Sequence, residues 1–125
     1  MESLTVNTFV KDIKKTIEFY EILGFKTVMT MPEGGDHVWA MMVNDGVTIM
    51  FQAMDSIGDQ LPGLDTDRFG GALLFYIKTK NIRTFFGSIM DKVEVVKPLE
   101  VALYGATEFT IKDVDGFYLT FAEDE

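Results

Sequence analysis

Two stretches of the chain show the same order of helix and hairpin signals. This internal repeat limits the possible folds more than any other feature of the sequence. Asp12 and Asn81 are both residue types that commonly precede a helix, and they lie 69 positions apart. The Asp-Gly pairs that begin at Asp45 and Asp115 are strong hairpin signals and lie 70 positions apart. Chance agreement is the alternative, because such caps and turns are common. The shared order and offset favour a duplicated module.

The first copy predicts one strand, one helix and three further strands. Asp12 precedes a helix whose apolar residues recur at helical spacing, and Gly24 is placed to end that helix. The expected strands cover residues 4–10, 25–31, 37–43 and 47–52. The first copy is therefore expected to be a βαβββ module.

The second copy predicts the same order. After a strand over residues 72–79, Asn81 is expected to cap a helix with apolar residues at helical spacing: Ile82, Phe85, Phe86, Ile89 and Val93. Further strands are expected near Val95 and Val96 and over residues 108–112 and 118–123. A module of this size is marginal for a core of its own. We therefore expect one α+β domain over residues 1–125, with modules at about 1–53 and 71–125 and a polar surface linker at 54–70.

The charge balance and the cysteine content exclude several classes of function. The chain has 11 Lys and Arg against 20 Asp and Glu, a formal net charge of -9, so it lacks the basic surface that a nucleic-acid partner requires. Its longest apolar runs are far shorter than the roughly 20 residues of a membrane-spanning helix, so no membrane partner is expected. No secretory signal is visible and there is no cysteine, which favours a cytoplasmic location.

Motifs at both ends of the chain resemble one superfamily. Residues 9–25 and the closing motifs Tyr104-Gly105, Glu108-Phe109 and Asp113-Val114-Asp115-Gly116-Phe117 resemble the glyoxalase, bleomycin-resistance and extradiol-dioxygenase proteins, also called vicinal oxygen chelate proteins. The resemblance covers nearly the whole chain. It implies two tandem βαβββ modules whose curled mixed sheets surround a cavity, often in a homodimer. It says little of function, because lyases, isomerases, dioxygenases and proteins that only bind share this fold.

The resemblance also implies four positions for metal ligands. Enzymes of the superfamily hold one divalent ion with His and carboxylate side chains on the first and last strands of each module. In this chain those positions hold Thr5, Met50, Leu74 and Thr120, which are poor ligands or none, and a shift of one residue brings in no better ligand. The single histidine, His37, is expected to be a solvated or singly hydrogen-bonded side chain. No metal and no other cofactor is therefore expected.

Strand alternation predicts which side chains line the ligand cavity. If the four ligand positions face the cavity, the same face carries the residues Asn7, Phe9, Met50, Gln52, Tyr76, Tyr118 and Thr120. Trp39 is added because it follows a Gly-Gly turn, and Tyr104 because bleomycin-resistance proteins often place an aromatic residue before the corresponding glycine. Those relatives commonly carry Arg where this chain has Thr107. Core packing is the alternative role for each of these aromatic residues. The alternate strand residues, which point to the other face of each sheet and include Phe51 and Phe121, are expected to pack under the helices.

These features predict a metal-independent protein that sequesters a hydrophobic small molecule, one that can carry positive charge, in the manner of antibiotic-resistance proteins. One alternative is a metal-dependent lyase, isomerase or dioxygenase of the same superfamily, or a metal-free catalyst that relies on Glu108 or His37. Another is an interaction module whose cavity is filled by its own Phe and Met side chains. The resemblance implies a homodimer, and the strand edges exposed at the module ends give a physical reason for dimerisation.

Overall fold

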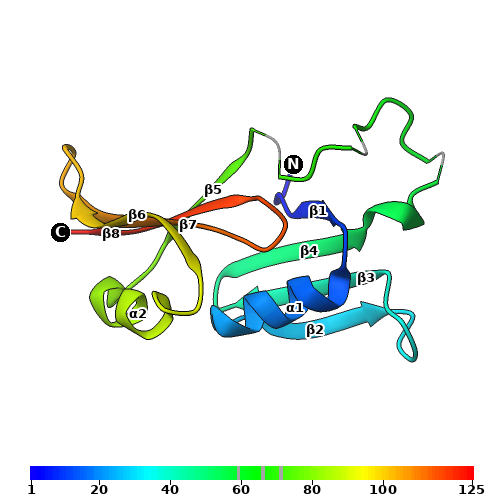
Figure 1. Cartoon of the computed structure of the whole chain (residues 1–125), viewed down its shortest axis with the longest axis horizontal. Helices are drawn as coiled ribbons and strands as arrows, with labels where there is room; N and C mark the ends of the chain where they lie inside the picture. The colour runs from blue at the N-terminus through cyan, green and yellow to red at the C-terminus, as the bar shows by residue number, and fades with distance from the viewer. Residues whose placement is uncertain (59, 66, 71) are drawn as a thin grey trace. The chain divides into compact units, whose positions relative to one another are not determined.

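The computed structural model describes residues 1–58, 60–65, 67–70 and 72–125 (Figure 1). The chain divides into two compact units, Met1–Phe69 and Gly70–Glu125. Each unit contains one α-helix and one four-stranded mixed sheet, so the two predicted βαβββ modules are confirmed. Across the described ranges, no helix has the length and apolar character needed to cross a membrane.

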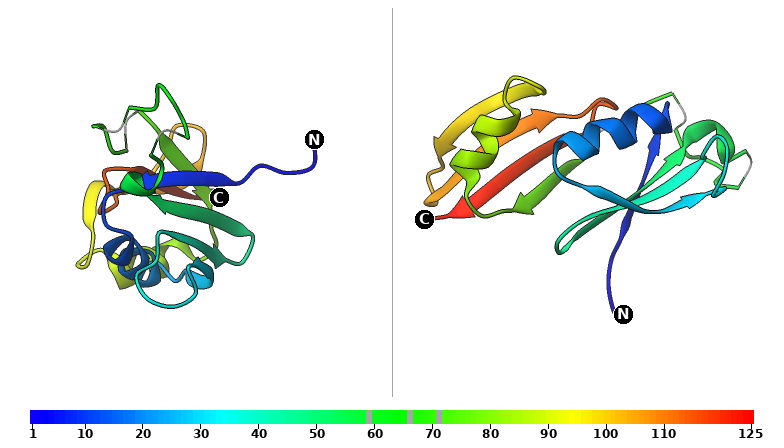
Figure 2. Two further views of the ribbon diagram at one scale, coloured as in Figure 1. Left: turned by 90° about the vertical axis from the view of Figure 1, so that its right-hand side faces the viewer. Right: turned by 90° about the horizontal axis from the view of Figure 1, so that it is seen from below.

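The first unit forms its sheet in the order β1-β4-β3-β2. Its elements are β1 (Val6–Val10), α1 (Ile13–Ile22), β2 (Lys26–Met31), β3 (Trp39–Asn44), β4 (Val47–Ala53) and the short 3-10 helix η1 (Met54–Ser56). Strands β1 and β4 are parallel, and the other two pairs are antiparallel. The sheet does not close, since β1 and β2 remain as edges. Figure 2 shows α1 lying along one side of this sheet.

Helix α1 begins and ends where the sequence predicts. The Asp12 side chain accepts a hydrogen bond from the backbone N–H of Lys15 at 3.3 Å, which satisfies one of the free donors of the first turn. Gly24 takes a φ of +96°, a conformation that glycine adopts without steric cost, and its N–H reaches the Glu21 carbonyl at 3.0 Å. The Asp45-Gly46 turn likewise joins β3 to β4, with Asn44 opposite Val47.

Aromatic side chains form the core between α1 and its sheet. The ring centroid of Tyr20 on α1 lies 4.7 Å from that of Phe51 on β4 and 5.4 Å from that of Phe25. Tyr20 and Phe51 are fully buried and Phe25 is 4% exposed. Phe51 was predicted to lie on the sheet face that packs under the helix, and this prediction is confirmed. After β4 the chain buries Ile57 as well.

The second unit repeats this topology with the order β5-β8-β7-β6. Its elements are β5 (Leu74–Lys78), α2 (Ile82–Ile89), β6 (Glu94–Val101), β7 (Ala106–Lys112) and β8 (Tyr118–Asp124). Phe109 on β7 is 1% exposed and contacts the rings of Phe85, Phe86 and Phe121, with centroids 4.9–5.8 Å apart. The second core therefore also lies between the helix and one face of the sheet.

The prediction that Val93 continues the apolar stripe of the second helix is wrong. Helix α2 ends at Ile89, and the N–H of Lys92 bonds to the Ile89 carbonyl at 2.8 Å in a turn. Strand β6 begins at Glu94, where pairing with Lys112 fixes the backbone in an extended conformation. Sheet pairing thus determines the structure here, and the helical spacing of Val93 is a coincidence.

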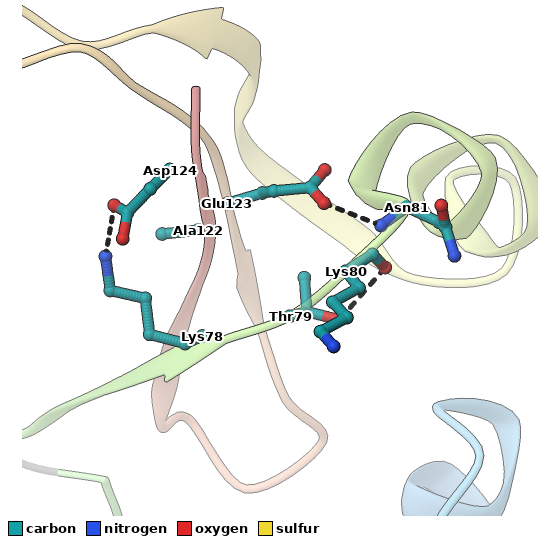
Figure 3. A pocket seen from close by; sticks show the side chains of 7 residues that line it. All are labelled: Lys78, Thr79, Lys80, Asn81, Ala122, Glu123 and Asp124. Atoms are coloured by element: carbon teal, nitrogen blue, oxygen red, sulfur yellow. Dashed lines mark hydrogen bonds and ion pairs between the residues drawn. The ribbon is translucent and has the colours of Figure 1, made fainter.

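Asn81 holds the predicted N-cap position, but its side chain makes no capping hydrogen bond. Its backbone is left-handed, with φ of +55°. The cap comes instead from Glu123 on β8, whose carboxylate accepts from the N–H of Asn81 at 2.9 Å (Figure 3). The same carboxylate accepts from the N–H of Ile82 at 3.1 Å. A carboxylate on the last strand therefore satisfies the first donors of α2.

Glu123→Ala is expected to lower the free energy of unfolding by about 1–2 kcal/mol, because two backbone donors lose their acceptor. Equilibrium urea denaturation followed by circular dichroism measures this loss. The matched control is Asp124→Ala, which removes an ion pair of 2.6 Å to Lys78 whose two side chains are both more than half exposed. That pair is expected to contribute less than the cap, because ion pairs between exposed side chains are weak. Equal losses in the two variants would contradict the cap.

Candidate ligand-binding faces

The face of the first sheet that points away from the core includes two adjacent rows of partly exposed side chains, here called the N-terminal face: Asn7, Phe9, Trp39, Met41, Met50 and Gln52. Residues directly opposite each other on paired strands project to the same side. Met50 lies opposite both Asn7 and Met41, and Gln52 lies opposite both Phe9 and Trp39. The face is therefore two rows of three residues across β1, β4 and β3.

Polar and apolar groups alternate over this face. Neighbouring strands lie about 4.8 Å apart and alternate residues about 6.8 Å apart, so the two rows cover an area comparable to a small planar molecule. Aromatic and thioether surface with a few hydrogen-bonding groups is typical of small-molecule sites. The sequence predicted four of these residues, Asn7, Phe9, Met50 and Gln52, to share a face, and it added Trp39 as a ligand contact on other grounds. It missed Met41, which the alternation from Trp39 could have indicated.

A chain of hydrogen bonds orders the polar groups of the N-terminal face. The Asn7 Nδ2 donates to Gln52 Oε1 at 3.0 Å, Gln52 Nε2 donates to Ser56 Oγ at 3.2 Å, and Ser56 Oγ donates to the Ala53 carbonyl at 2.7 Å. Asn7 Oδ1 is shielded from solvent and has no hydrogen-bond partner among the described residues. Ser56 was missed by the sequence analysis because it lies in the stretch expected to be a surface linker.

The second sheet also has a face that points away from its helix, here called the C-terminal face: Leu74, Tyr76, Glu108, Thr110, Lys112, Tyr118 and Thr120. Tyr76 lies opposite Thr120, and Tyr118 lies opposite Leu74 on one side and Lys112 on the other. Tyr76 is 47% exposed, whereas Thr120 is 6% exposed and shares a 2.8 Å hydrogen bond with Thr110. Three of the predicted ligand-binding residues, Tyr76, Tyr118 and Thr120, thus come together on this face.

The fourth predicted residue of this unit, Tyr104, reaches the C-terminal face through Glu108. Tyr104 lies in the turn between β6 and β7, is 70% exposed, and donates its hydroxyl proton to Glu108 Oε2. Tyr76 donates to the same oxygen at 2.8 Å. The hydrogen bond to Glu108 raises the pKa of Tyr104 above its ordinary value of 10.0, and contact with Tyr76 raises it further. Glu108 was one of the two catalytic candidates in the sequence. In the structure its carboxylate accepts hydrogen bonds from two tyrosine hydroxyls.

Glu108→Gln is expected to bring the pKa of Tyr104 down toward the ordinary range, because the carboxylate that favours the protonated phenol is removed. Titration of labelled tyrosine by ¹³C NMR measures this change. Glu100→Gln serves as control, since Glu100 lies opposite Glu108 on β6 but is ion-paired with Lys97 at 3.2 Å. An unchanged Tyr104 titration in Glu108→Gln, or an equal shift in the control, would contradict the assignment.

Two lysines lie over tyrosine rings of the C-terminal face. Lys78 Nζ is 5.5 Å from the ring centroid of Tyr76, and Lys112 Nζ is 5.7 Å from that of Tyr118. Both distances fall within the range of cation–π attraction. Each of these two rings is therefore paired with an ammonium group of its own unit.

Comparison with known proteins identifies the family. A sequence profile of the Glyoxalase/Bleomycin resistance protein/Dioxygenase superfamily matches residues 4–121. The chain belongs to this superfamily. No curated protein matches the chain significantly in sequence.

Solved structures of the superfamily fold match the whole chain at low sequence identity. TioX from Micromonospora sp. ML1 is 16% identical, with 100% of both chains covered and a TM-score of 0.78. A bleomycin-binding protein solved with bleomycin is 21% identical over 100% of both chains, with a TM-score of 0.69. A bleomycin resistance determinant encoded on the transposon Tn5 is 21% identical over 100% of this chain and 99% of its own, with a TM-score of 0.71. At these identities the likeness establishes the fold.

The residues at the superfamily's metal positions do not fit a divalent ion. Thr5 is exposed before β1, Leu74 is 50% exposed and has no donor atom, and Met50 offers a neutral thioether. The Thr120 hydroxyl is engaged with Thr110. Among the residues that the structure describes, no three His, Asp or Glu side chains lie close enough to hold an ion elsewhere. No chemical step through a metal is derived for this chain.

His37 lies outside the strand in which it was expected. Strand β3 begins at Trp39, and His37 is in the exposed loop before it. Its Nδ1 lies 2.7 Å from the Pro32 carbonyl oxygen, which can only accept, so Nδ1 carries the proton. The expected single hydrogen bond is thus present, and it occupies one of the two ring nitrogens.

A depression of about 550 Å³ lies at the ends of β5 and β8 (Figure 3). It is lined by Lys78, Thr79, Lys80, Asn81, Ala122, Glu123 and Asp124. Glu123 caps α2 and Asp124 pairs with Lys78, so both carboxylates of this depression already serve the structure of the second unit.

Proposed function

We propose that this chain is a metal-independent small-molecule-binding protein that sequesters a hydrophobic ligand able to carry positive charge. The N-terminal face carries this proposal, because it leaves aromatic and thioether groups partly exposed beside an ordered chain of amides. Membership of the superfamily and the bleomycin-binding neighbours support a role in binding or resistance. The proposed contacts are the residues predicted from sequence: Asn7, Phe9, Trp39, Met50, Gln52, Tyr76, Tyr104, Tyr118 and Thr120.

One observation supports a cationic group on the ligand. The formal net charge of -9 raises the local concentration of cations near the protein. A ligand with an aromatic plane and a cationic arm would use this charge together with the aromatic surface of the N-terminal face.

Titration with metal-free bleomycin, a cationic glycopeptide, tests the proposal in a buffer that contains a chelator. Trp39 is the only tryptophan, so its fluorescence reports on the N-terminal face, and calorimetry gives the affinity independently. We expect saturable binding that chelator leaves unchanged. Binding of a panel of aromatic cations only after addition of a divalent ion would contradict metal independence and favour the enzymes of the superfamily. No response to bleomycin or to the panel would contradict the binding function.

We also propose that the protein is a homodimer in the cytoplasm. Strand β2 is an edge of the first sheet, and its Val28, Met29 and Met31 are each at least 50% exposed. Exposed apolar edges are sites where sheets pair with a second chain. The chain has no cysteine and so forms no disulfide, which means that an oxidising compartment would not stabilise it. Light scattering is expected to give twice the chain mass of 14.1 kDa, and a single-chain mass at high concentration would contradict the dimer.

A further inference from the structure

We propose that the first sheet binds a soft monovalent metal ion, Cu(I) or Ag(I), through the thioethers of Met29, Met41 and Met50. These three residues are here called the methionine row. The inference goes beyond the proposed function and does not depend on it. The metal independence proposed above concerns the divalent ions of the superfamily's enzymes, which differ from Cu(I) and Ag(I) in charge and in preferred ligands.

Strand pairing places the three methionines in one row. Met29 on β2 lies opposite Met41 on β3, and Met41 lies opposite Met50 on β4, so Met29 extends the N-terminal face by one strand (Figure 1). Residues directly opposite each other project to the same side, with Cβ atoms about 4.5–5.5 Å apart. Met42, the residue after Met41, is fully buried in the core, so Met41 projects to the open side of the sheet.

The methionine row is accessible from solvent. Met29 is 50% exposed, and Met41 and Met50 are partly exposed. Methionine side chains are unbranched and flexible, so neighbouring sulfur atoms can turn toward one ion. The dimer proposed through the edge of β2 would pair backbone groups of that strand and leave its side chains on the faces of the sheet. An ion could therefore reach the row in the single chain and in that dimer.

The chemistry of the thioether determines which ion the row can hold. A thioether sulfur is neutral and soft, and such ligands select Cu(I), whereas Mg²⁺, Ca²⁺ and Mn²⁺ prefer oxygen ligands. It also has no proton to lose, so its binding of a metal does not compete with protonation, unlike binding by cysteine or histidine. The formal net charge of -9 raises the local concentration of cations around the protein.

Trp39 lies beside the methionine row. It precedes Met41 by two residues on β3 and therefore projects to the same face. Its diagonal neighbours on β2 and β4 are Met29 and Met50, and such positions, about 7–8 Å apart, are within reach of aromatic and long side chains. Tryptophan is the side chain whose ring attracts cations most strongly. Trp39 would thus both favour an ion in the row and report its binding by fluorescence.

Other soft donors in the chain are few. There is no cysteine, and the single histidine, His37, lies in the exposed loop before β3. Within the described ranges, no three His, Asp or Glu side chains are grouped so as to hold an ion. In the same ranges, the methionine row is therefore the candidate for a site with three donors, and His37 is the competing donor that an experiment must control for.

Titration of the full chain with silver nitrate in a chloride-free buffer tests the inference. Ag(I) shares the charge and softness of Cu(I) and is stable in air. In protein labelled with ¹³C at the methionine methyl groups, we expect the NMR signals of the row to shift while the signal of the buried Met42 stays in place. Trp39 fluorescence is expected to be quenched, and calorimetry to give one ion per chain, with the same affinity in neutral and in mildly acidic buffer. Cu(I), kept reduced without oxygen, is expected to displace Ag(I).

Leucine variants identify the ligands, because leucine has a similar volume but no sulfur. Loss of an outer partner of a metal ligand typically costs about 10- to 100-fold in affinity, so Met41→Leu is expected to weaken Ag(I) binding at least about tenfold. Met31→Leu is the matched control, since Met31 is 53% exposed on the same strand as Met29 but lies opposite Trp39, in the next row. This variant and His37→Gln are expected to keep the wild-type affinity.

Three results would overturn the inference: no saturable binding of Ag(I), equal losses in Met41→Leu and Met31→Leu, or loss of binding in His37→Gln or in mildly acidic buffer. Thermal unfolding of each variant without metal shows whether a loss arises from a damaged fold, and Met50→Leu then provides a second test of the row. The proposed function is measured separately, because bleomycin is titrated with chelator present. Failure of Ag(I) to bind would therefore leave that function intact.

Discussion

Phe51→Ala is expected to lower the free energy of unfolding by about 3–5 kcal/mol, the largest effect of any substitution considered for the first unit. Phe51 is fully buried and its ring lies 4.7 Å from the ring of Tyr20, so truncation leaves a cavity between α1 and the sheet. Domains of this size have total stabilities of about 5–15 kcal/mol, so the variant should be studied at low temperature by urea denaturation.

The neighbouring variant Met50→Ala is the matched control. Met50 is the preceding residue of β4 but projects to the N-terminal face, where it is partly exposed. Its truncation removes less buried surface and is expected to cost less than about 1 kcal/mol. Comparable losses in the two variants would contradict the division of β4 into a core side and an open side. A low affinity for bleomycin in Met50→Ala would add support for the binding role of the open side.

Trp39→Ala is expected to weaken bleomycin binding by at least about tenfold, while the free energy of unfolding changes by less than about 1 kcal/mol. A tryptophan offers the largest aromatic surface to a ligand and is often the dominant contact in a binding site. Trp39 lies opposite Gln52 at one end of its row and is partly exposed in the free protein. Calorimetry is the suitable measurement, because the variant has no tryptophan fluorescence.

Val38→Ala is the control for Trp39→Ala. Val38 directly precedes β3, is 42% exposed and does not belong to the N-terminal face. Its truncation is expected to leave the affinity unchanged, and Trp39→Phe is expected to recover part of it. An unchanged affinity in Trp39→Ala would remove the N-terminal face from the proposed site, and attention would move to the tyrosines of the second unit.

Most of the fold could be predicted from the sequence because its signals are local. Asp12 acts on a donor three residues away, and the Asp45-Gly46 turn joins strands that are adjacent in the chain. The two errors in the second module involve distant residues. The cap of α2 comes from Glu123, 42 residues after Asn81, and the pairing of β6 with β7 overrides the helical spacing of Val93. Neither contact can be predicted from the residues that are adjacent to it in the sequence.

The candidate site could be predicted only to the level of which side chains share a face. Strand alternation placed Asn7, Met50 and Gln52 together, because the direction of a side chain in a strand follows from parity. It could not show that Ser56 orients Gln52, since this depends on the turn after β4. The cavity implied by the resemblance, and the role of these residues in binding, stay predictions.

In each sheet the strand that is synthesised last lies in the interior, and this delays folding of the sheet during translation. Strand β4 lies between β1 and β3, and β8 lies between β5 and β7. While the ribosome is still translating, the first sheet lacks a central strand until Ala53 has been added, and the second until Asp124 has been added. Nascent chains arrested before these points should therefore remain sensitive to protease, and protection should arise in two separate steps as each interior strand emerges.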